Sequence, residues 1–186
     1  MANEERISVN RLAKLLEYDA ENGRLTWLPR GREQFLSNRS HNIFKARFAG
    51  KAALNSRRPD GYLVGGVDGL SCYAHRVCSA LLSGAWPVGE IDHINGDRSD
   101  NRAANLRDVG RSENTKNKQI GIRNKSGALG LFLEHTGNYR VRITDNYNTI
   151  ELGRFADFDE ALSVRKAAER EFSYHQNHGR KIEVMA

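Results

Sequence analysis

The sequence has few cysteines, no long apolar run and, over one stretch, almost no acidic residues. Only Cys72 and Cys78 are present, which excludes a disulfide framework and makes a reducing cytoplasm the expected compartment. No apolar run approaches the roughly 20 residues that a membrane-spanning helix needs. The opening residues, MANEERISVN, lack the apolar stretch of a secretory signal, so no export is expected.

Acidic residues are scarcest between Arg24 and Arg58, where Glu33 is the single one. The nine basic residues of that stretch are Arg24, Arg30, Arg32, Arg39, Lys45, Arg47, Lys51, Arg57 and Arg58. A second basic stretch, diluted by acids, runs from Arg98 to Lys125. With a net charge of +6 and a pI near 9.5, the chain is expected to bind a polyanion, and an anionic membrane surface is the main alternative.

The hydrophobic patterns predict an α+β fold in several parts. Residues 1–70 are expected to form a basic, DNA-contacting flank of helix and hairpin. Its predicted elements are a helix capped by Ser8 with Leu12, Leu15 and Leu16 on one face, a strand at 25–27, and a hairpin at 61–73. Residues 30–58 show little periodicity and are predicted to be loops and short strands.

Residues 71–120 are predicted to contain a helix near 75–82, followed along the chain by a strand, a loop, a second strand and a second helix. The first strand ends at Ile91-Asp92-His93, the second covers 106–109, and a helix covers 111–118. This segment is too small to bury a core alone and must pack on the preceding part.

After a linker at 121–128, residues 129–176 predict a separate domain of three strands and a helix. The strands are expected at 129–133, 139–143 and 149–155, and Asp157 is the candidate cap of the helix. The tail, 177–186, is polar and expected to be frayed.

The chemistry is concentrated in the run Asp92-His93-Ile94-Asn95-Gly96-Asp97 and in the polar residues that follow it, which include Asn105 and Asn114. Phosphodiester hydrolysis needs a base for water and a cation for the phosphate. Histidine suits the base, and Asp92 and Asn114 offer the hard oxygen ligands that Mg²⁺ or Mn²⁺ prefers. Because neighbouring strand residues point to opposite faces, a bulged strand end is expected between Asp92 and His93.

The segment Tyr73 to Lys118 resembles the HNH, or ββα-metal, nuclease motif of phage and homing endonucleases. The matching text is AHR from Ala74, DHINGDRSDNR from Asp92, NL from Asn105 and RSENTKNK from Arg111. The resemblance implies a DNA endonuclease with His93 as the general base and Asp92 and Asn114 as metal ligands. It also implies that Asn105 holds the loop and orients the histidine, and that His75 and Arg76 lie near the scissile phosphate, although His75 fits a core histidine equally well.

Residues from about Ser126 to Phe172 resemble the ethylene-response-factor, or APETALA-type, DNA-binding domain. The matching text is SGALGLFLEHTGNYRVRI from Ser126, LGRF from Leu152 and FDEAL from Phe158. The resemblance implies a sheet that lies in the major groove. The candidate DNA contacts of the whole chain are Arg76, Arg98, Arg102, Arg107, Lys116, Lys118, Arg140, Arg142 and Arg154.

Other interpretations of the same residues stay open. Cys72, His75 and Cys78 lack a fourth partner for structural zinc, and His41, His135, His175 and His178 are expected at the surface. The chain fits a monomer or homodimer that nicks or cuts double-stranded DNA in a bacterial or phage-infected cell. The alternatives are a DNA-binding regulator with an inactive motif and an RNA-directed nuclease.

Overall fold

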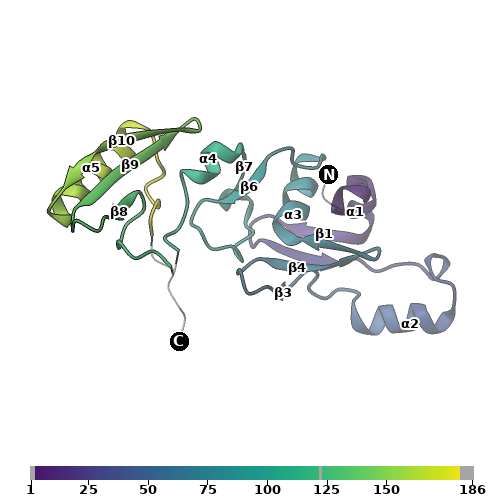
Figure 1. The fold of residues 1–186 in the computed structure, drawn as a ribbon. Helices are drawn as coiled ribbons and strands as arrows, with labels where there is room; N and C mark the ends of the chain where they lie inside the picture. The colour runs from purple at the N-terminus through teal and green to yellow at the C-terminus, as the bar shows by residue number, and fades with distance from the viewer. Residues whose placement is uncertain (1–2, 122, 181–186) are drawn as a thin grey trace. The chain divides into compact units, whose positions relative to one another are not determined.

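The computed structural model describes residues 3–121 and 123–180, which form two compact units (Figure 1). The first unit ends at Val109 and the second begins at Gly110. Both units combine helices with antiparallel sheets, so the α+β class is confirmed. The boundary between them lies inside the predicted nuclease segment 71–120, just before the helix that carries Asn114. In the described ranges, no helix is long and apolar enough to cross a bilayer.

The first unit is built from short elements. They are η1 (Asn3–Arg6), α1 (Val9–Leu15), β1 (Leu16–Asp19), β2 (Arg24–Trp27), η2 (Arg32–Gln34), α2 (Asn38–Arg47), β3 (Ser56–Arg57), β4 (Leu63–Val67), β5 (Leu70–Tyr73), α3 (Ala74–Ser83), β6 (Glu90–His93), η3 (Ala103–Asn105) and β7 (Leu106–Val109). The strands pair as β1–β2, β3–β4–β5 and β6–β7, all antiparallel. The predicted strands and hairpin of this unit are confirmed.

The helix α1 begins at the predicted cap, but Leu16, which was predicted on its apolar face, lies outside the helix. The Ser8 side chain accepts a hydrogen bond from the backbone N–H of Arg11 (3.2 Å), which satisfies one of the donors left over at a helix start. Leu12 and Leu15 are buried, while Leu16 is extended and opens β1. The apolar face of α1 therefore continues directly into the first strand.

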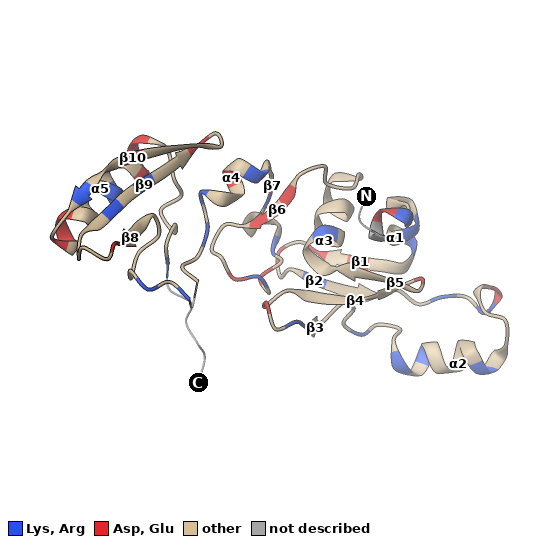
Figure 2. Ribbon diagram, viewed as in Figure 1, with Lys and Arg blue, Asp and Glu red and all other residues tan. Residues whose placement is uncertain are grey.

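The expectation of loops and short strands over 30–58 is wrong, because α2 occupies ten residues of that stretch. Ser37 and Ser40 cap one another reciprocally at its start. None of its residues is fully buried, but Phe44 stacks against Phe48 and packs edge-on against Trp27. Since α2 has basic side chains and no acidic ones, it carries blue bands and no red ones in Figure 2.

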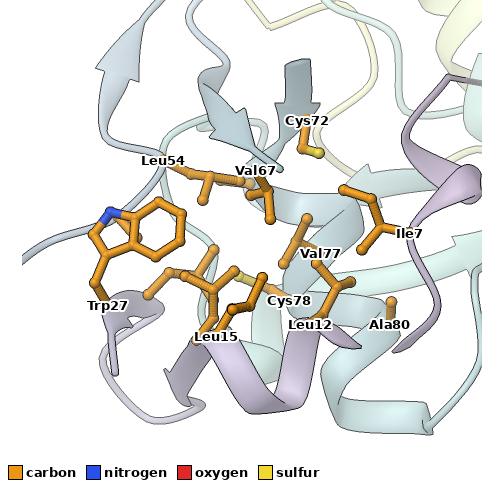
Figure 3. Close-up of a cluster of buried hydrophobic side chains, with 14 residues drawn as sticks. Ile7, Leu12, Leu15, Trp27, Leu54, Val67, Cys72, Val77, Cys78 and Ala80 are labelled. Atoms are coloured by element: carbon orange, nitrogen blue, oxygen red, sulfur yellow. The ribbon is translucent and has the colours of Figure 1, made fainter. Parts of the chain in front are cut away.

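The core of the first unit joins the N-terminal flank to α3. Leu12 and Leu15 from α1 pack with Val67, Val77 and Cys78 from β4 and α3 (Figure 3). Both cysteines lie in this cluster as small apolar side chains. The expectation that the nuclease segment must pack on the preceding residues is thereby confirmed.

The second unit is a three-stranded sheet covered by one long helix. Its elements are α4 (Arg111–Thr115), β8 (Leu131–Leu133), β9 (Tyr139–Asp145), β10 (Asn148–Phe155) and α5 (Phe158–Glu171), and the strand order is β10–β9–β8. Asp157 caps α5 by accepting a hydrogen bond from the Glu160 N–H (2.8 Å). Val141 of β9 is buried against Ala161 of α5, as the alternating pattern predicts.

A buried polar network ties the described part of the tail to α5. Arg165 donates to Glu169 (Nε–Oε1, 2.9 Å), and the His178 ring lies within 3.3 Å of the Arg165 guanidinium. Burial lowers the pKa of His178 to about 4. The expectation of a surface His178 on a frayed tail is therefore wrong for residues up to Arg180, and the remaining residues, 181–186, lie outside the described ranges.

Replacing Leu12 with alanine tests whether this core holds the first unit together. The Leu12 side chain is completely buried, so Leu12→Ala is expected to lower the free energy of unfolding by about 2–5 kcal/mol. Both tryptophans, Trp27 and Trp86, lie in the first unit, so urea unfolding followed by tryptophan fluorescence reports this unit alone. The fully exposed Leu36 gives the matched control, and Leu36→Ala is expected to change stability by less than about 0.5 kcal/mol.

Candidate active site

The pairing of β6 with β7 sets the positions of Asp92 and His93. The register places Asp92 opposite Arg107 and His93 opposite Leu106. It shows no shift along the whole pair, so the expected bulge between Asp92 and His93 is wrong. Because the strand alternates regularly, the two side chains leave it on opposite faces. They are nevertheless both nearly buried, at 8% and 3% exposure.

Asp92 forms a close ion pair with the residue directly across the ladder. Arg107 donates from Nε (2.9 Å) and from Nη2 (2.7 Å), and both contacts reach Oδ2 of the carboxylate. Charge-assisted hydrogen bonds of this kind are among the strong ones in proteins. Arg107, predicted as a DNA contact, therefore uses its guanidinium on the candidate metal ligand.

His93 is held by a polar loop residue and surrounded by rings. Its Nε2 atom lies 3.2 Å from Oδ1 of Asn101, and Asn101 is itself buried. Since an amide oxygen accepts, this contact favours the tautomer with hydrogen on Nε2 and the lone pair on Nδ1. Burial lowers the pKa of His93, partly opposed by the contact with Asn101, so the ring is neutral and able to accept a proton at neutral pH.

His75 and Tyr62 pack against the His93 ring, and Tyr73 packs against His75. The His75 ring lies 5.3 Å from that of His93, and Tyr62 contacts both, at 4.8 Å and 5.8 Å between centroids. Tyr73 packs on His75 at 5.5 Å. Burial lowers the pKa of His75 to about 3, and its Nδ1 atom has no hydrogen-bond partner within the described part of the chain. His75 is thus a neutral buried ring beside the candidate base.

Asn105 fixes the loop that follows β6. Its side-chain oxygen accepts from the backbone N–H of Asn95 (2.9 Å), and its amide nitrogen donates to the carbonyl of Asp100 (2.8 Å). The loop-holding role that the resemblance implies matches these bonds. The side-chain bond to the His93 ring comes instead from Asn101, a residue inside the motif to which the sequence analysis assigned no role.

The N-terminal flank supports the same loop from outside the motif. The Tyr18 hydroxyl donates to the carbonyl of Asn101 (2.8 Å), and the Ala103 N–H donates to the carbonyl of Ala20 (2.9 Å). Gly23 is in the left-handed region (φ 69°), and a Cβ built there would lie 2.5 Å from the backbone nitrogen of Arg102. Tyr18, Tyr62 and Gly23 were not predicted as site residues, although the Asn22-Gly23 turn was recognisable.

Asn114 lies on α4, at the start of the second unit. Asn114, the predicted second metal ligand, therefore belongs to a different unit from Asp92 and His93. Asn117, on the same segment, is buried, and its side-chain oxygen accepts from Arg180 Nη1 (2.8 Å).

Most of the predicted DNA-contacting side chains make intramolecular contacts. Arg76 pairs with Glu5, Arg102 with Asp100, and Lys116 with Asp145. Arg98 donates to the Asp60 carbonyl (2.8 Å) and lies over the Tyr62 ring. On the sheet of the second unit, Glu134 contacts Arg140 and Arg154, and Glu151 contacts Arg142 and Arg154. Lys118 is exposed.

The donor set for a metal is small and oxygen-rich. Across the described residues, no group of three or more His, Cys, Asp or Glu side chains is clustered as a metal site. Asp92 supplies one hard carboxylate, and the motif adds amide oxygens, so these donors fit a hydrated Mg²⁺ or Mn²⁺ ion rather than a closed zinc site. Cys78 does not fit a metal thiolate, because burial raises its pKa to about 12.

Comparison with known protein families gives a match within the first and second units. Residues 72–116 match the family model described as HNH endonuclease. This range includes His75, Asp92, His93, Asn105 and Asn114, and it crosses the boundary between the two units. Searches of curated proteins and of solved structures found no match.

The neutral, buried His75 predicts a loss of stability in acid. The unfolded chain takes up a proton near the ordinary histidine pKa of 6.5, whereas the folded chain resists it down to about 3. The free energy of unfolding should therefore fall as pH drops below 6.5, by about 2 kcal/mol at pH 5 from this residue. Urea unfolding of His75→Leu and wild type, followed by tryptophan fluorescence at pH 7 and pH 5, measures the difference. Equal acid losses in both proteins would contradict this account.

A double-mutant cycle tests the ion pair between Asp92 and Arg107. Asp92→Asn, Arg107→Gln and the double variant are expected to give a coupling free energy of about 1–3 kcal/mol, because the carboxylate is nearly buried. The exposed pair Arg58–Asp60 is the matched control, with an expected coupling below about 1 kcal/mol. Equal coupling free energies in the two cycles would show that the nearly buried Asp92–Arg107 pair is no stronger than an exposed ion pair.

Proposed function

We propose that the chain is a metal-dependent DNA endonuclease of the HNH type. The observation that carries the proposal is the environment of His93. A neutral, buried imidazole is fixed through Nε2 by Asn101, next to a carboxylate on the adjacent residue. The family match over residues 72–116 supports nuclease chemistry for this segment.

In this proposal each polar group around His93 has a distinct task. Nδ1 of His93 accepts the proton of the attacking water, because Nε2 is engaged by Asn101. Asn105 keeps the loop closed around the ring through Asn95 and Asp100. His75 and Tyr62 keep water away from the inner face of the ring and limit its rotation.

Asp92 and Asn114 would hold the divalent cation, Mg²⁺ or Mn²⁺. When bound, such an ion stabilises the charge that develops on the phosphate and leaving oxygens. Arg107 already pairs with Asp92, so the carboxylate is held in a fixed orientation by its neighbour. Asn114 is assigned from its place in the motif, and substitution is the test of that assignment.

The second unit is proposed to assist DNA binding in the manner of an ethylene-response-factor domain. Its sheet and helix order agree with that resemblance. Arg140, Arg142 and Arg154 are the predicted contacts. Each of them pairs with a glutamate and must leave it in order to bind a phosphate. One site per chain would nick a single strand, and a homodimer or two successive events would cut both.

Relaxation of supercoiled plasmid by the purified full-length chain tests this proposal. Nicking is expected with Mg²⁺ or Mn²⁺ and not with EDTA, and His93→Ala should reduce the rate by about a hundredfold or more. Asp92→Asn and Asn114→Ala should also reduce it, while the exposed His135 gives a matched histidine control, His135→Ala, with unchanged rate.

The alternatives give different outcomes in the same assay. Plasmid that is bound but never cut, by wild type and variants alike, would indicate a DNA-binding regulator with an inactive motif. Cleavage of single-stranded or structured RNA under conditions where plasmid stays intact would indicate an RNA-directed nuclease.

A further inference from the structure

Part of the unpaired positive charge of the first unit lies on α2. This helix contains Arg39, Lys45 and Arg47 and no acidic residue. Among the residues that the structure describes, none of these three side chains has an ion-pair partner. The arginines on the sheet of the second unit are all paired with glutamates. The charge available to a polyanion therefore lies at α2 rather than on that sheet.

Two faces of α2 have opposite character. At about 100° per residue, His41, Phe44 and Phe48 form the inner face, where Phe44 packs on Trp27 and Phe35. The outer face consists of Arg39, Asn42, Ile43 and Ala46, all exposed. Lys45 projects on one side of this outer face and Arg47 on the other. A polar face flanked by cations on both sides matches a groove flanked by two phosphate backbones.

Arg30 adds a cation that is already positioned. Its guanidinium stacks on Phe44 at 4.5 Å and on Trp27 at 5.3 Å. Its Nε is buried without a hydrogen-bond partner in the described part of the chain. With His41, Phe44 and Lys45 it lines a cavity of about 450 Å³. Such a cavity, apolar on its walls and cationic at Arg30 and Lys45, suits a sugar–phosphate unit of a nucleic-acid strand.

We propose that α2 enters the major groove of the DNA substrate, with Arg39 and Asn42 toward base edges and Arg30, Lys45 and Arg47 on the flanking phosphates. An α-helix, about 10–12 Å across, fits the major groove, which is about 12 Å wide. Arginine and asparagine are the side chains that read guanine and adenine there, and Ile43 and Ala46 suit thymine methyl groups. This inference rests on the proposed function for the identity of the substrate.

The salt dependence of binding tests the phosphate contacts. The probe is a labelled 40-base-pair duplex pool with a random centre, bound by the full-length chain in EDTA so that no metal-supported cleavage occurs. The variant Arg30→Gln/Lys45→Gln/Arg47→Gln is expected to flatten the slope of log K against log salt by about 2–3 units. Affinity at 0.1 M salt should fall on the order of a hundredfold.

The matched control removes the same amount of charge from three exposed side chains that are not candidate DNA contacts. Arg6→Gln/Lys14→Gln/Arg170→Gln should leave the slope within about one unit of wild type. Circular dichroism checks that each variant is folded. Equal slopes for the α2 variant and wild type, or a larger effect of the control, would overturn the proposal.

Selection from the random pool tests the base contacts. Asn42→Ala is expected to keep the salt slope of wild type but to lose an adenine from the enriched motif. The same motif, or none, for both proteins would overturn groove recognition by α2. Plasmid nicking distinguishes failure of this inference from failure of the proposed function. If the chain nicks plasmid but the α2 variants bind DNA like wild type, only this inference is overturned. If the chain neither binds nor nicks DNA, the proposed function is overturned as well.

Discussion

The alternation of side chains along β6 is the constraint on which the rest of the site depends. A regular ladder sends Asp92 and His93 to opposite faces, so the two residues meet different surroundings although they are neighbours in sequence. Asp92 meets the guanidinium of Arg107, which stabilises a carboxylate. His93 meets Tyr62 and His75, which favour an uncharged ring. One strand thereby places an arginine-paired carboxylate and a neutral imidazole, the candidate ligand and the candidate base, on adjacent residues.

The remaining parts of the first unit keep these surroundings in place. α3 carries His75 and is anchored by Val77 and Cys78 in the core shared with α1. The loop with Asn101 is held from inside by Asn105 and from outside by the β1–β2 turn. The residues that contact the His93 ring thus come from different segments of the chain, and the hydrophobic core brings these segments together.

Much of this arrangement could be predicted from local sequence patterns. The strands predicted to end at His93 and to cover 106–109 and 139–143 correspond to β6, β7 and β9. Ser8 and Asp157 marked helix starts correctly, because a cap is a short-range interaction. The spacing of chemical residues indicated the motif, and the family match covers it. Pairing β6 with β7 residue by residue would also have placed Arg107 opposite Asp92.

Other features depend on contacts between distant residues and left weaker signals. Helix α2 was missed because its inner face is only half buried, so its His41, Phe44 and Phe48 spacing lay within a basic, mostly polar stretch. The burial of His178 depends on Arg165 and Glu169, which are charged and do not mark a core in a hydrophobic pattern. Asn101 could not be distinguished from Asn105 in the sequence, because the fold of the loop decides which of the two side chains reaches the His93 ring.

The close approach of Gly23 to the loop at Arg102 bears on how such a motif can be inherited or transplanted. The matched range begins at residue 72, yet Tyr18, Gly23 and Tyr62 precede it and complete the surroundings of His93. The matched segment therefore depends on residues outside it for the surroundings of His93. A recombination event or a designed fusion that joined it to another protein without the β1–β2 hairpin would transfer the candidate catalytic side chains but not the contacts that orient them.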